Sequence, residues 1–412
     1  MITDLLAAQA VADPYSVFAE LRDAGPVVWS PEHRAWILTT HAEVNAGFRD
    51  LRLSSDRLTP LQRRLSPEHQ VALGPTFDLL RGWMVFHDPP GHDRLREPLR
   101  RTFTPKAVEA LRPKIAVLVH ELVAALETRL RDGETVDLVD ALAFPLPAIV
   151  IAELLGVPPE DRDRFKLWSN ELAAIVFGAS NRSEQATRAA AGTAHFAEYF
   201  GALIERYRRS PADNLVSALI AVADGGTSDA GSRLTPGELV GALTLLLFGG
   251  HETTANLIGN ATLSLLRHGG ELAWLHDHPE AIGPAVEEVH RYDGSTKVMV
   301  RVVGDAHERH GRPLEPGQTV FLSVAGANRD PAVFVDPNRL WLARPNAQAH
   351  QGFGHGIHYC VGAPLARLET QLALGALVAR LPDLRLAVPD HELTYGASIL
   401  GRGLHALPVA AG

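Results

Sequence analysis

The chain has a single cysteine, Cys360, among its 412 residues. It therefore forms no disulfide within itself, and a cysteine-rich zinc or iron–sulfur site is excluded, so any chemistry at Cys360 uses one sulfur alone. Lysine is scarce as well, because almost all basic side chains are arginine. The lysines are Lys106, Lys114, Lys166 and Lys297.

Long apolar runs are also missing. The stretch Leu142–Val157 is interrupted by Glu153, and Leu239–Gly250 is shorter than the roughly 20 residues that cross a bilayer. The amino terminus contains Asp4 and lacks the basic start and long apolar stretch of a secretory signal. We therefore expect a cytoplasmic protein that does not associate with a membrane.

Charge and composition exclude further classes. The formal net charge is −9, from 39 Lys and Arg against 48 Asp and Glu, and this mild acidity argues against a nucleic-acid-binding protein. Hydrophobic residues make up 46% and charged residues 21%, which is typical of a globular protein. No repeat or polar linker divides the sequence. We expect one domain over residues 1–412.

Helical periodicity dominates the sequence. Apolar residues recur at three- and four-residue spacing in Val108–Arg131, Pro159–Phe177, Gln185–Arg209, Pro236–Arg267, Ile282–Tyr292 and Pro364–Leu381. Short strand-like pieces interrupt these segments at Val27–Trp29, Trp36–Thr39, Val298–Val303 and Thr319–Val324. The pattern predicts a mainly α fold with a small β region.

The segment Pro236–Arg267 predicts the longest helix. Thr235 and Glu238 have the spacing of a capping box at its start. Its middle contains adjacent Gly249 and Gly250 followed by polar residues, although a glycine weakens a helix by about 1 kcal/mol relative to alanine. Weak and polar residues at the centre of an apolar helix indicate that this helix bends around something.

The strongest local signal runs from Phe353 to Gly362, Phe-Gly-His-Gly-Ile-His-Tyr-Cys-Val-Gly, and leads into a predicted helix. Glycines on both sides of Cys360 allow tight turns and the close approach of a flat ligand to the backbone. A helix that starts just beyond the sulfur directs backbone N–H groups at it and stabilises a thiolate. A metal ligand requires this setting, whereas a core cysteine does not.

Two kinds of zinc site can be compared with a haem iron at this loop. A zinc site at His355, His358 and Cys360 has no fourth ligand at a usual spacing. The segment from His251 begins like a zinc-protease helix, but Ala255 stands where that motif needs its second histidine. What remains is a single thiolate on iron in a porphyrin, an arrangement that favours cleavage of an O–O bond.

Four segments, in this order, resemble the soluble bacterial cytochrome P-450 family: Gly249–Thr254, Glu288–Arg291, Ala327–Pro331 and the cysteine loop. The resemblance covers nearly the whole chain. It implies a triangular-prism fold with haem b between the long central helix and the cysteine loop. It also implies activation of O2 with two electrons from a redox partner, which is a ferredoxin with its reductase or a flavin-type protein.

The resemblance also assigns roles. Glu252 and Thr253 match the acid–alcohol pair for proton delivery, and a hydroxyl with a carboxylate behind it can hold water and relay protons. Cys360 matches the axial ligand of the haem iron, and Phe353 the ring that screens the sulfur. The cofactor-binding residues are His92, Arg96, Arg301, Phe353, His358, Cys360 and Gly362, of which His92, Arg96, Arg301 and His358 meet the haem propionates. A structural ion network that supports the loop comprises Glu288, Arg291 and Arg344.

The substrate pocket follows by analogy alone, with Leu58–Val85 and Leu172–Ser180 among its walls. The pocket residues we expect are Val85, Leu247, Phe248, Gly249, Lys297, Val298, Met299, Ile399 and Leu400. They are mostly apolar, which favours a hydrophobic small molecule. Lys297 is the exception, because its ammonium either meets an acidic group of the substrate or extends to a propionate or to solvent.

We therefore expect a cytochrome P-450 monooxygenase that hydroxylates or oxidatively couples a hydrophobic small molecule of secondary metabolism. Two alternatives stay open: a haem-binding protein without turnover that serves as a binding or recruitment module, and a peroxygenase that uses hydrogen peroxide. The pair Glu252 and Thr253 favours the monooxygenase, because a silent relative needs no proton relay. We expect an acidic electron-transfer partner to dock over Arg100, Arg101 and Arg112.

Overall fold

The structure, a computed structural model, describes residues 4–158, 161–176, 183–224 and 233–412. The chain divides into two compact units. The first comprises Met1–Leu53, Val108–Pro147 and His251–Gly412, and the second comprises Ser54–Ala107 and Ala148–Gly250. Within the described ranges, no helix is both long and apolar enough to cross a membrane. The single domain over 1–412 stays a prediction.

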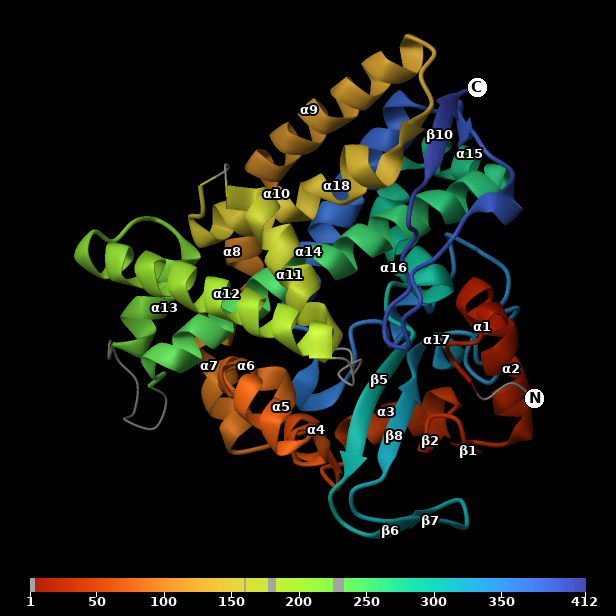
Figure 1. The fold of residues 1–412 in the computed structure, drawn as a ribbon. Coiled ribbons are helices and arrows are strands. Elements are labelled where there is room, and N and C mark those ends of the chain that lie inside the picture. The colour runs from red at the N-terminus through yellow and green to blue at the C-terminus, as the bar shows by residue number, and fades with distance from the viewer. Residues whose placement is uncertain (1–3, 159–160, 177–182, 225–232) are drawn as a thin grey trace. The chain divides into compact units, whose positions relative to one another are not determined.

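The structure is mainly helical, as predicted (Figure 1). Helices of the first unit are α1 (Ala8–Ala12), α2 (Pro14–Ala24), α3 (His41–Arg49), α9 (Arg112–Arg131), α15 (Gly269–Asp277), α16 (Ile282–Asp293), α17 (Val324–Ala327) and α18 (Ala363–Arg380). Helices of the second unit are α4 (Leu58–Arg64), α5 (Pro67–Ala72), α6 (Gly74–Leu80), α7 (Gly91–Thr102), α11 (Arg162–Val176), α12 (Ser183–Arg209) and α13 (Leu215–Ala223). A unit boundary falls within α8 (Pro105–Glu109), α10 (Pro145–Leu155) and α14 (Pro236–Arg267).

The β region is small, also as predicted. One sheet has the strand order β1 (Val27–Ser30), β2 (Ala35–Leu38), β8 (Thr319–Ser323), β5 (Val298–Val303) and β3 (Leu53–Ser54). A second has the order β4 (Val136–Asp137), β10 (Pro408–Ala411) and β9 (Leu384–Leu386), and β6 (His307–Arg309) pairs with β7 (Arg312–Leu314). Strands β5 and β8 run antiparallel side by side in Figure 1.

Helices cover both faces of the five-stranded sheet. Successive side chains of a strand point to opposite faces. Ile37 of β2 accordingly joins a buried cluster with Phe18 of α2, whereas its neighbour Leu38 joins another with Phe48 of α3. Strand β5 contributes to both clusters and is therefore held between these two layers.

The long helix α14 has the bounds that the sequence predicts. Thr235 N–H donates to Glu238 Oε2 at 2.8 Å, and Glu238 N–H donates to Thr235 Oγ1 at 3.2 Å, which confirms the capping box. Gly241 permits a close backbone approach, because a Cβ built on it would lie 2.6 Å from the Cα of Gly82. The predicted bend of this helix stays a prediction.

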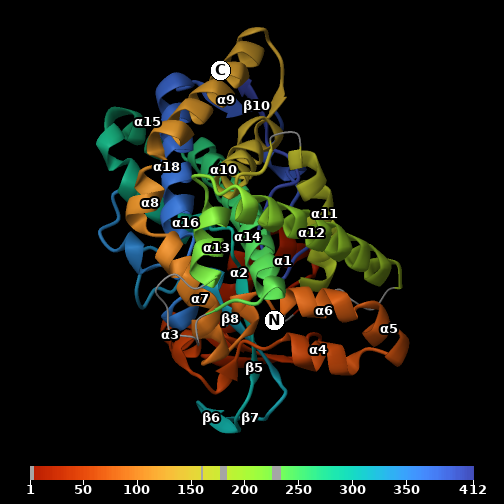
Figure 2. The ribbon, with the colours of Figure 1, turned by 90° about the vertical axis from the view of Figure 1, so that its left-hand side faces the viewer.

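Two other predicted helices differ from the structure. The helix predicted over Val108–Arg131 is found as α9, but its predicted start is wrong. The chain has a break between α8, which ends at Glu109, and α9, which begins at Arg112, because Pro113 has no N–H to continue a helix and suits a helix start. The helix predicted over Pro159–Phe177 is found as α11, and residues 159, 160 and 177 lie outside the described ranges. Figure 2 shows α11 along α12, which it meets through an aromatic cluster that includes Phe165 and Phe196.

Candidate functional site

Cys360 lies in a loop that is closed by its own backbone. Its N–H donates to the carbonyl oxygen of Phe353 at 2.9 Å. Gly354 and Gly356 have φ angles of +70° and +68°, which other residues rarely adopt. The thiol is exposed, and Gly362 is the N-terminal cap of α18, so the positive end of that helix lies just beyond the sulfur.

Aromatic and charged groups surround the ring of Phe353. The His290 ring meets it edge-on, with centroids 4.4 Å apart, and the guanidinium carbon of Arg367 lies 4.4 Å from its centroid. His350 lies farther off at 5.7 Å. Burial, reinforced by the charge that His350 can carry, lowers the pKa of His290 well below its usual value. His290 is therefore neutral and packs as a flat apolar group.

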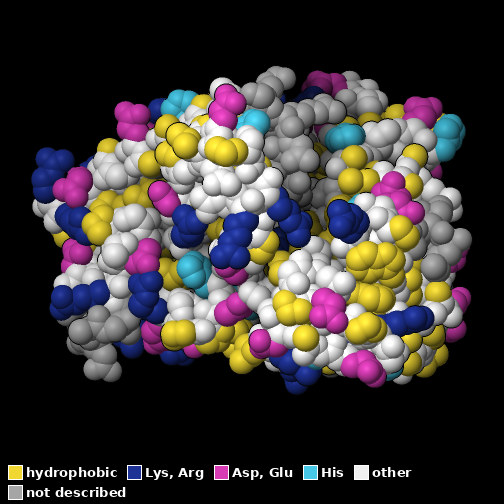
Figure 3. Space-filling view, turned by 60° about the horizontal axis from the view of Figure 1, so that its bottom comes forward, with side chains coloured by type: hydrophobic (Ala, Val, Ile, Leu, Met, Phe, Trp, Pro, Cys, Tyr) yellow, Lys and Arg dark blue, Asp and Glu magenta, His cyan; other side chains and the backbone are white. Residues whose placement is uncertain are grey.

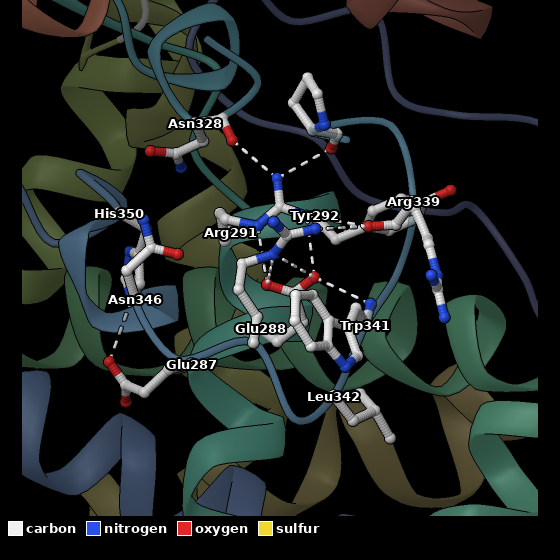
Figure 4. A network of polar contacts seen from close by, with 12 residues as sticks. Glu287, Glu288, Arg291, Tyr292, Asn328, Arg339, Trp341, Leu342, Asn346 and His350 are labelled. Atoms are coloured by element: carbon white, nitrogen blue, oxygen red, sulfur yellow. Dashed lines mark hydrogen bonds and ion pairs between the residues drawn. The ribbon is translucent and has the colours of Figure 1, made fainter. Parts of the chain in front are cut away.

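The structure brings Glu288, Arg291 and Arg344 together, as the resemblance implies. Figure 4 shows Arg291 against Glu288. Arg291 donates to the two carboxylate oxygens of Glu288 at 2.7 and 2.8 Å, and Arg344 Nε lies 3.1 Å from both. None of the three residues is more than 3% exposed. The other guanidinium N–H groups donate to backbone carbonyls, among them those of Asn328 and Val335.

A second network lies beside the first and was not predicted from the sequence. Arg367 donates to both oxygens of Glu287 at 2.6 and 2.9 Å, and His350 Nε2 lies 3.1 Å from the same carboxylate (Figure 4 shows Glu287 and His350). Gly352 N–H donates to His350 Nδ1 at 3.0 Å, so the ring proton of His350 is on Nε2. Burial opposes ionisation of Glu287, yet the hydrogen bonds from Arg367 and His350 hold its pKa well below its usual value.

This second network ties α16 and α18 to the start of the cysteine loop. The available sequence signal was the second carboxylate, Glu287, directly before Glu288. Adjacent residues of a helix are turned by about 100° from each other, so two neighbouring glutamates serve two different partners. The partners His350 and Arg367 follow at distances in the chain that no local pattern connects.

The polar centre of α14 combines buried and exposed groups. Burial raises the pKa of Glu252, which is half-buried. Thr253 is exposed, and Gly249, one turn earlier, is exposed too. A Cβ built on Gly249 would meet no atom of the described residues within 4 Å. His251 is buried, with its ring edge-on to Phe144 at 5.8 Å.

The residues assigned to the propionates occur in both units. In the first, Arg301 of β5 is 7% exposed, and His358 ends the short helix η7 (Gly356–His358). In the second, α7 carries His92 and Arg96. Burial lowers the pKa of His92, although the hydrogen bond with Asp93 opposes this, so its imidazole is neutral at pH 7.

The expected pocket residues have varied surroundings. Val298 is fully buried in the cluster with Phe18, and Phe248 packs against Trp83 with centroids 5.1 Å apart, so both have partners within the core. Met299, the next residue along β5, is 36% exposed. The rest are buried (Leu247, Lys297), half-buried (Val85, Ile399, Leu400) or exposed (Gly249). Of Leu172–Ser180, residues 177–180 lie outside the described ranges.

The donor set fits a haem. In the part of the chain that is described, no group of three or more His, Cys, Asp or Glu side chains could hold a metal ion. The exposed Cys360 thiol at the start of α18 suits an iron that is also held by a non-protein group, such as the macrocycle of a porphyrin. Within the first unit, Arg301 and His358 have the side-chain types that suit the carboxylates of a haem.

Comparison with known proteins identifies the family. The family model for cytochrome P-450 matches residues 283–382. The chain is 40% identical over 412 residues to vitamin D(3) 25-hydroxylase of Pseudonocardia autotrophica, with 99% of this chain and 96% of the relative covered. It is 37% identical over 415 residues to 6-deoxyerythronolide B hydroxylase of Saccharopolyspora erythraea, with 99% and 98% covered. The crystal structure of CalO2 matches with a TM-score of 0.89 and 32% identity, covering 99% of this chain and 98% of CalO2.

The chain therefore belongs to the cytochrome P-450 family. It is a haem-containing oxidoreductase of the monooxygenase class, and its fold is that of the solved P-450 structures.

Proposed function

We propose that the protein is a haem-thiolate monooxygenase that inserts one oxygen atom of O2 into a hydrophobic small molecule of secondary metabolism. The other oxygen atom leaves as water. The prosthetic group in this proposal is haem b, and the electrons come from a ferredoxin with its reductase or from a flavin-type partner. The observation that carries the proposal is the exposed Cys360 thiol at the start of α18, in a loop closed on Phe353.

Haem b bound at Cys360 supplies the activation of dioxygen and the transfer of oxygen to the substrate. Cys360 binds the iron as a thiolate, and the N-terminus of α18 stabilises its negative charge. Phe353 covers one side of the loop, where His290 and Arg367 fix its ring. His92, Arg96, Arg301 and His358 are the proposed partners of the propionates.

Glu252 and Thr253 deliver protons in this proposal. Thr253 is exposed, and a hydroxyl can hydrogen-bond a water molecule. Because burial raises the pKa of Glu252, this carboxyl exchanges a proton near neutral pH more readily than an ordinary glutamate does. Splitting O2 consumes two protons, and this pair supplies them in succession from solvent.

The redox partner is proposed to be acidic and to dock over Arg100, Arg101 and Arg112. Arg100 and Arg101 belong to the second unit and both pair with Glu97 at 2.8 Å, whereas Arg112 belongs to the first and pairs with Glu109. Basic and acidic side chains are interspersed across the face drawn in Figure 3. Steering of the partner therefore depends on arginines whose charge is partly balanced by their own neighbours.

The carbon-monoxide adduct of the reduced protein tests the cysteine assignment. The wild type is expected to show the red-shifted absorption band of a thiolate haem, and Cys360→Ser is expected to lose it, because oxygen replaces the sulfur that donates electron density. A wild-type adduct without this band overturns the proposed function.

A second experiment separates monooxygenase from peroxygenase and from a protein without turnover. With a ligand that displaces the iron-bound water, Thr253→Ala should keep its affinity but divert reductant into hydrogen peroxide, while Thr253→Ser, which retains the hydroxyl, stays coupled. Turnover driven by peroxide and indifferent to Thr253 supports the peroxygenase. Ligand binding without any reductant consumption in the wild type supports the recruitment module.

A further inference from the structure

Lys297 is a buried cation at the entrance to strand β5. It is 3% exposed, and its backbone is fixed on two sides: its N–H donates to the carbonyl of Leu400 at 2.7 Å, and its carbonyl accepts from the N–H of Ala325 at 3.0 Å. Thr296, the preceding residue, forms a β-bridge with Gly401. The stem of the lysine therefore starts from a fixed point inside the first unit.

The ammonium of Lys297 has no hydrogen-bond or ion-pair partner among the described residues. A small hollow beside its stem belongs to the buried cluster under α2, and its other lining side chains, those of Leu5, Ala10, Pro14, Val17, Phe18 and Ile399, offer no acceptor. A buried ammonium without an acceptor is unfavourable by several kcal/mol in a protein interior. The positive charge of Lys297 is therefore not balanced by a negative group of the described residues.

The positive charge of Arg402 also acts on Lys297 and makes a negative partner more favourable there. Burial and then the positive charge of Arg402 lower the pKa of Lys297 to about 8, so most of the lysine remains protonated at neutral pH. Arg402 does not need the same counter-ion, because it is paired with Asp293 at 2.7 Å and donates to the carbonyls of Val11 and Ala12. One positive charge is left over, and a single negative charge balances it.

Position along the strand relates Lys297 to the proposed haem site. Lys297 stands between a bridged residue and the first residue of β5, so in extended backbone it shares a face with Met299 and Arg301. Val298 and Val300 belong to the other face, which packs against α2. Arg301 is a proposed propionate partner, and four residues at about 3.3 Å each place Lys297 roughly 13 Å along the strand from it.

We propose that Lys297 is the anion-recognising residue of the substrate pocket and binds the carboxylate of an otherwise hydrophobic substrate. This inference rests on the proposed function and names the substrate class, a hydrophobic monocarboxylate. A compact ammonium suits one carboxylate group, and a more highly charged anion would exceed the one charge that is left to balance.

Matched ligand pairs test the proposal on the haem-loaded full chain. Straight-chain carboxylates of eight to sixteen carbons and their methyl esters differ in charge while their chains stay the same. Binding is measured by calorimetry and by the shift of the haem absorption band in the wild type, Lys297→Met and Lys297→Gln. Lys114→Met, which removes an exposed lysine, is the control.

The wild type should bind at least one carboxylate about tenfold more tightly than its ester, a difference of about 1.4 kcal/mol. Lys297→Met and Lys297→Gln should lose that preference, Lys297→Arg should retain part of it, and Lys114→Met should keep it. A wild type that prefers no carboxylate to its ester, or a preference that survives both neutral substitutions, overturns the proposal. The carbon-monoxide band of the same samples reports separately on the proposed function.

Because the chain has few lysines, a second readout is practical. Nitrogen-15 NMR of labelled lysine side chains follows the Lys297 ammonium directly, with Lys297→Gln identifying its signal. A bound carboxylate should raise the pKa of Lys297, whereas the ester should leave it unchanged. Equal pKa values with both ligands contradict the proposed contact even where the variants fold poorly.

Discussion

Two buried charged sites in the first unit are built in opposite ways. At Glu288 a carboxylate is shared by Arg291 and Arg344, and the remaining N–H groups of both arginines reach backbone carbonyls. At Lys297 an equally buried cation has no acceptor in the described part of the chain. The first arrangement satisfies its charges and holds the backbone that supports the cysteine loop. The second leaves one charge unsatisfied, which is what a site for a charged ligand requires.

Removing the carboxylate from the satisfied site should have the largest effect on stability. Glu288→Gln leaves two buried guanidiniums without a counter-charge, and breaking a buried ion pair in this way costs about 3–5 kcal/mol. Urea unfolding of the variant should show that loss, accompanied by weak haem retention. Glu121→Gln, at an exposed glutamate of α9, serves as the control and should unfold like the wild type. A loss below about 1 kcal/mol in Glu288→Gln contradicts the structural role.

The same kind of substitution at the unsatisfied site should act in the opposite direction. Lys297→Met removes a buried ammonium and keeps most of the side-chain volume, so the ligand-free variant should be more stable than the wild type by up to about 3 kcal/mol at pH 7. Its measurement is urea unfolding, with Lys114→Met as the control. A destabilised Lys297→Met would show that the ammonium is satisfied in the folded chain.

The pH dependence gives the sign of this effect independently. The folded pKa of Lys297, about 8, lies below the ordinary value of 10.5, so the unfolded chain holds the proton more strongly between these values. Wild-type stability should therefore rise from pH 8 to pH 10.5 as the folded lysine loses its charge. Below pH 8 the folded lysine is charged, and the free-energy cost of burying that charge is fully present. Lys297→Met should lack the rise that Lys297 contributes.

The sequence predicts contacts between residues that are close to each other along the chain. The capping box of Thr235 and Glu238 and the i,i+3 pair of Glu288 and Arg291 depend on neighbours within one turn, and the structure has both contacts. Arg344 came only from the resemblance, because it approaches Glu288 across 56 residues of chain. Local spacing carries no information about such a contact.

The partners of Glu287 and the surroundings of Lys297 could not be predicted from the sequence, for the same physical reason. His350 and Arg367 meet Glu287 only after the chain has folded, so nothing near Glu287 in the sequence marks them. Tertiary packing determines which acceptors lie near the Lys297 ammonium, and the periodicity of the sequence gives no information about them. The break before α9 is different, because Pro113 was a local signal that the apolar periodicity of the segment outweighed.

A half-buried ion pair in the second unit should behave between the two extremes. Glu238 accepts from Thr235 N–H and pairs with Arg94 of α7, and the hydrogen bonds from Arg94, opposed by burial, lower its pKa to about 2. The stabilisation is fully present above the ordinary value of 4.5 and is lost as the pH falls toward 2. Glu238→Gln should therefore lose about 1 kcal/mol at pH 7 after allowance for solvent screening, and less in acid.

Unfolding of Glu238→Gln at pH 7 and pH 3 measures this difference. Glu205→Gln is the control, because that glutamate pairs with Arg208 in the same unit but is 63% exposed, and it should change stability little at either pH. Equal losses at pH 7 and pH 3 in Glu238→Gln would indicate that the charge of Glu238 is not what stabilises the start of α14.

The ion pairs of Glu97, whose arginine partners are 67% and 41% exposed, should show almost no effect on stability and an effect on partner encounter instead. Glu97 accepts from Arg100 and Arg101, whose hydrogen bonds lower its pKa to about 2, so it is ionised at neutral pH. Exposed ion pairs contribute little to folding, and Glu97→Gln should have the same free energy of unfolding as the wild type.

Removing the Glu97 carboxylate leaves the charges of Arg100 and Arg101 without their counter-charge. Reduction by an acidic ferredoxin should then become faster at low salt and fall more steeply as ionic strength rises. Glu68→Gln, the same change of charge at an exposed glutamate of α5, should leave the salt dependence as it was, and an equal response of both variants would place the partner somewhere other than over Arg100 and Arg101.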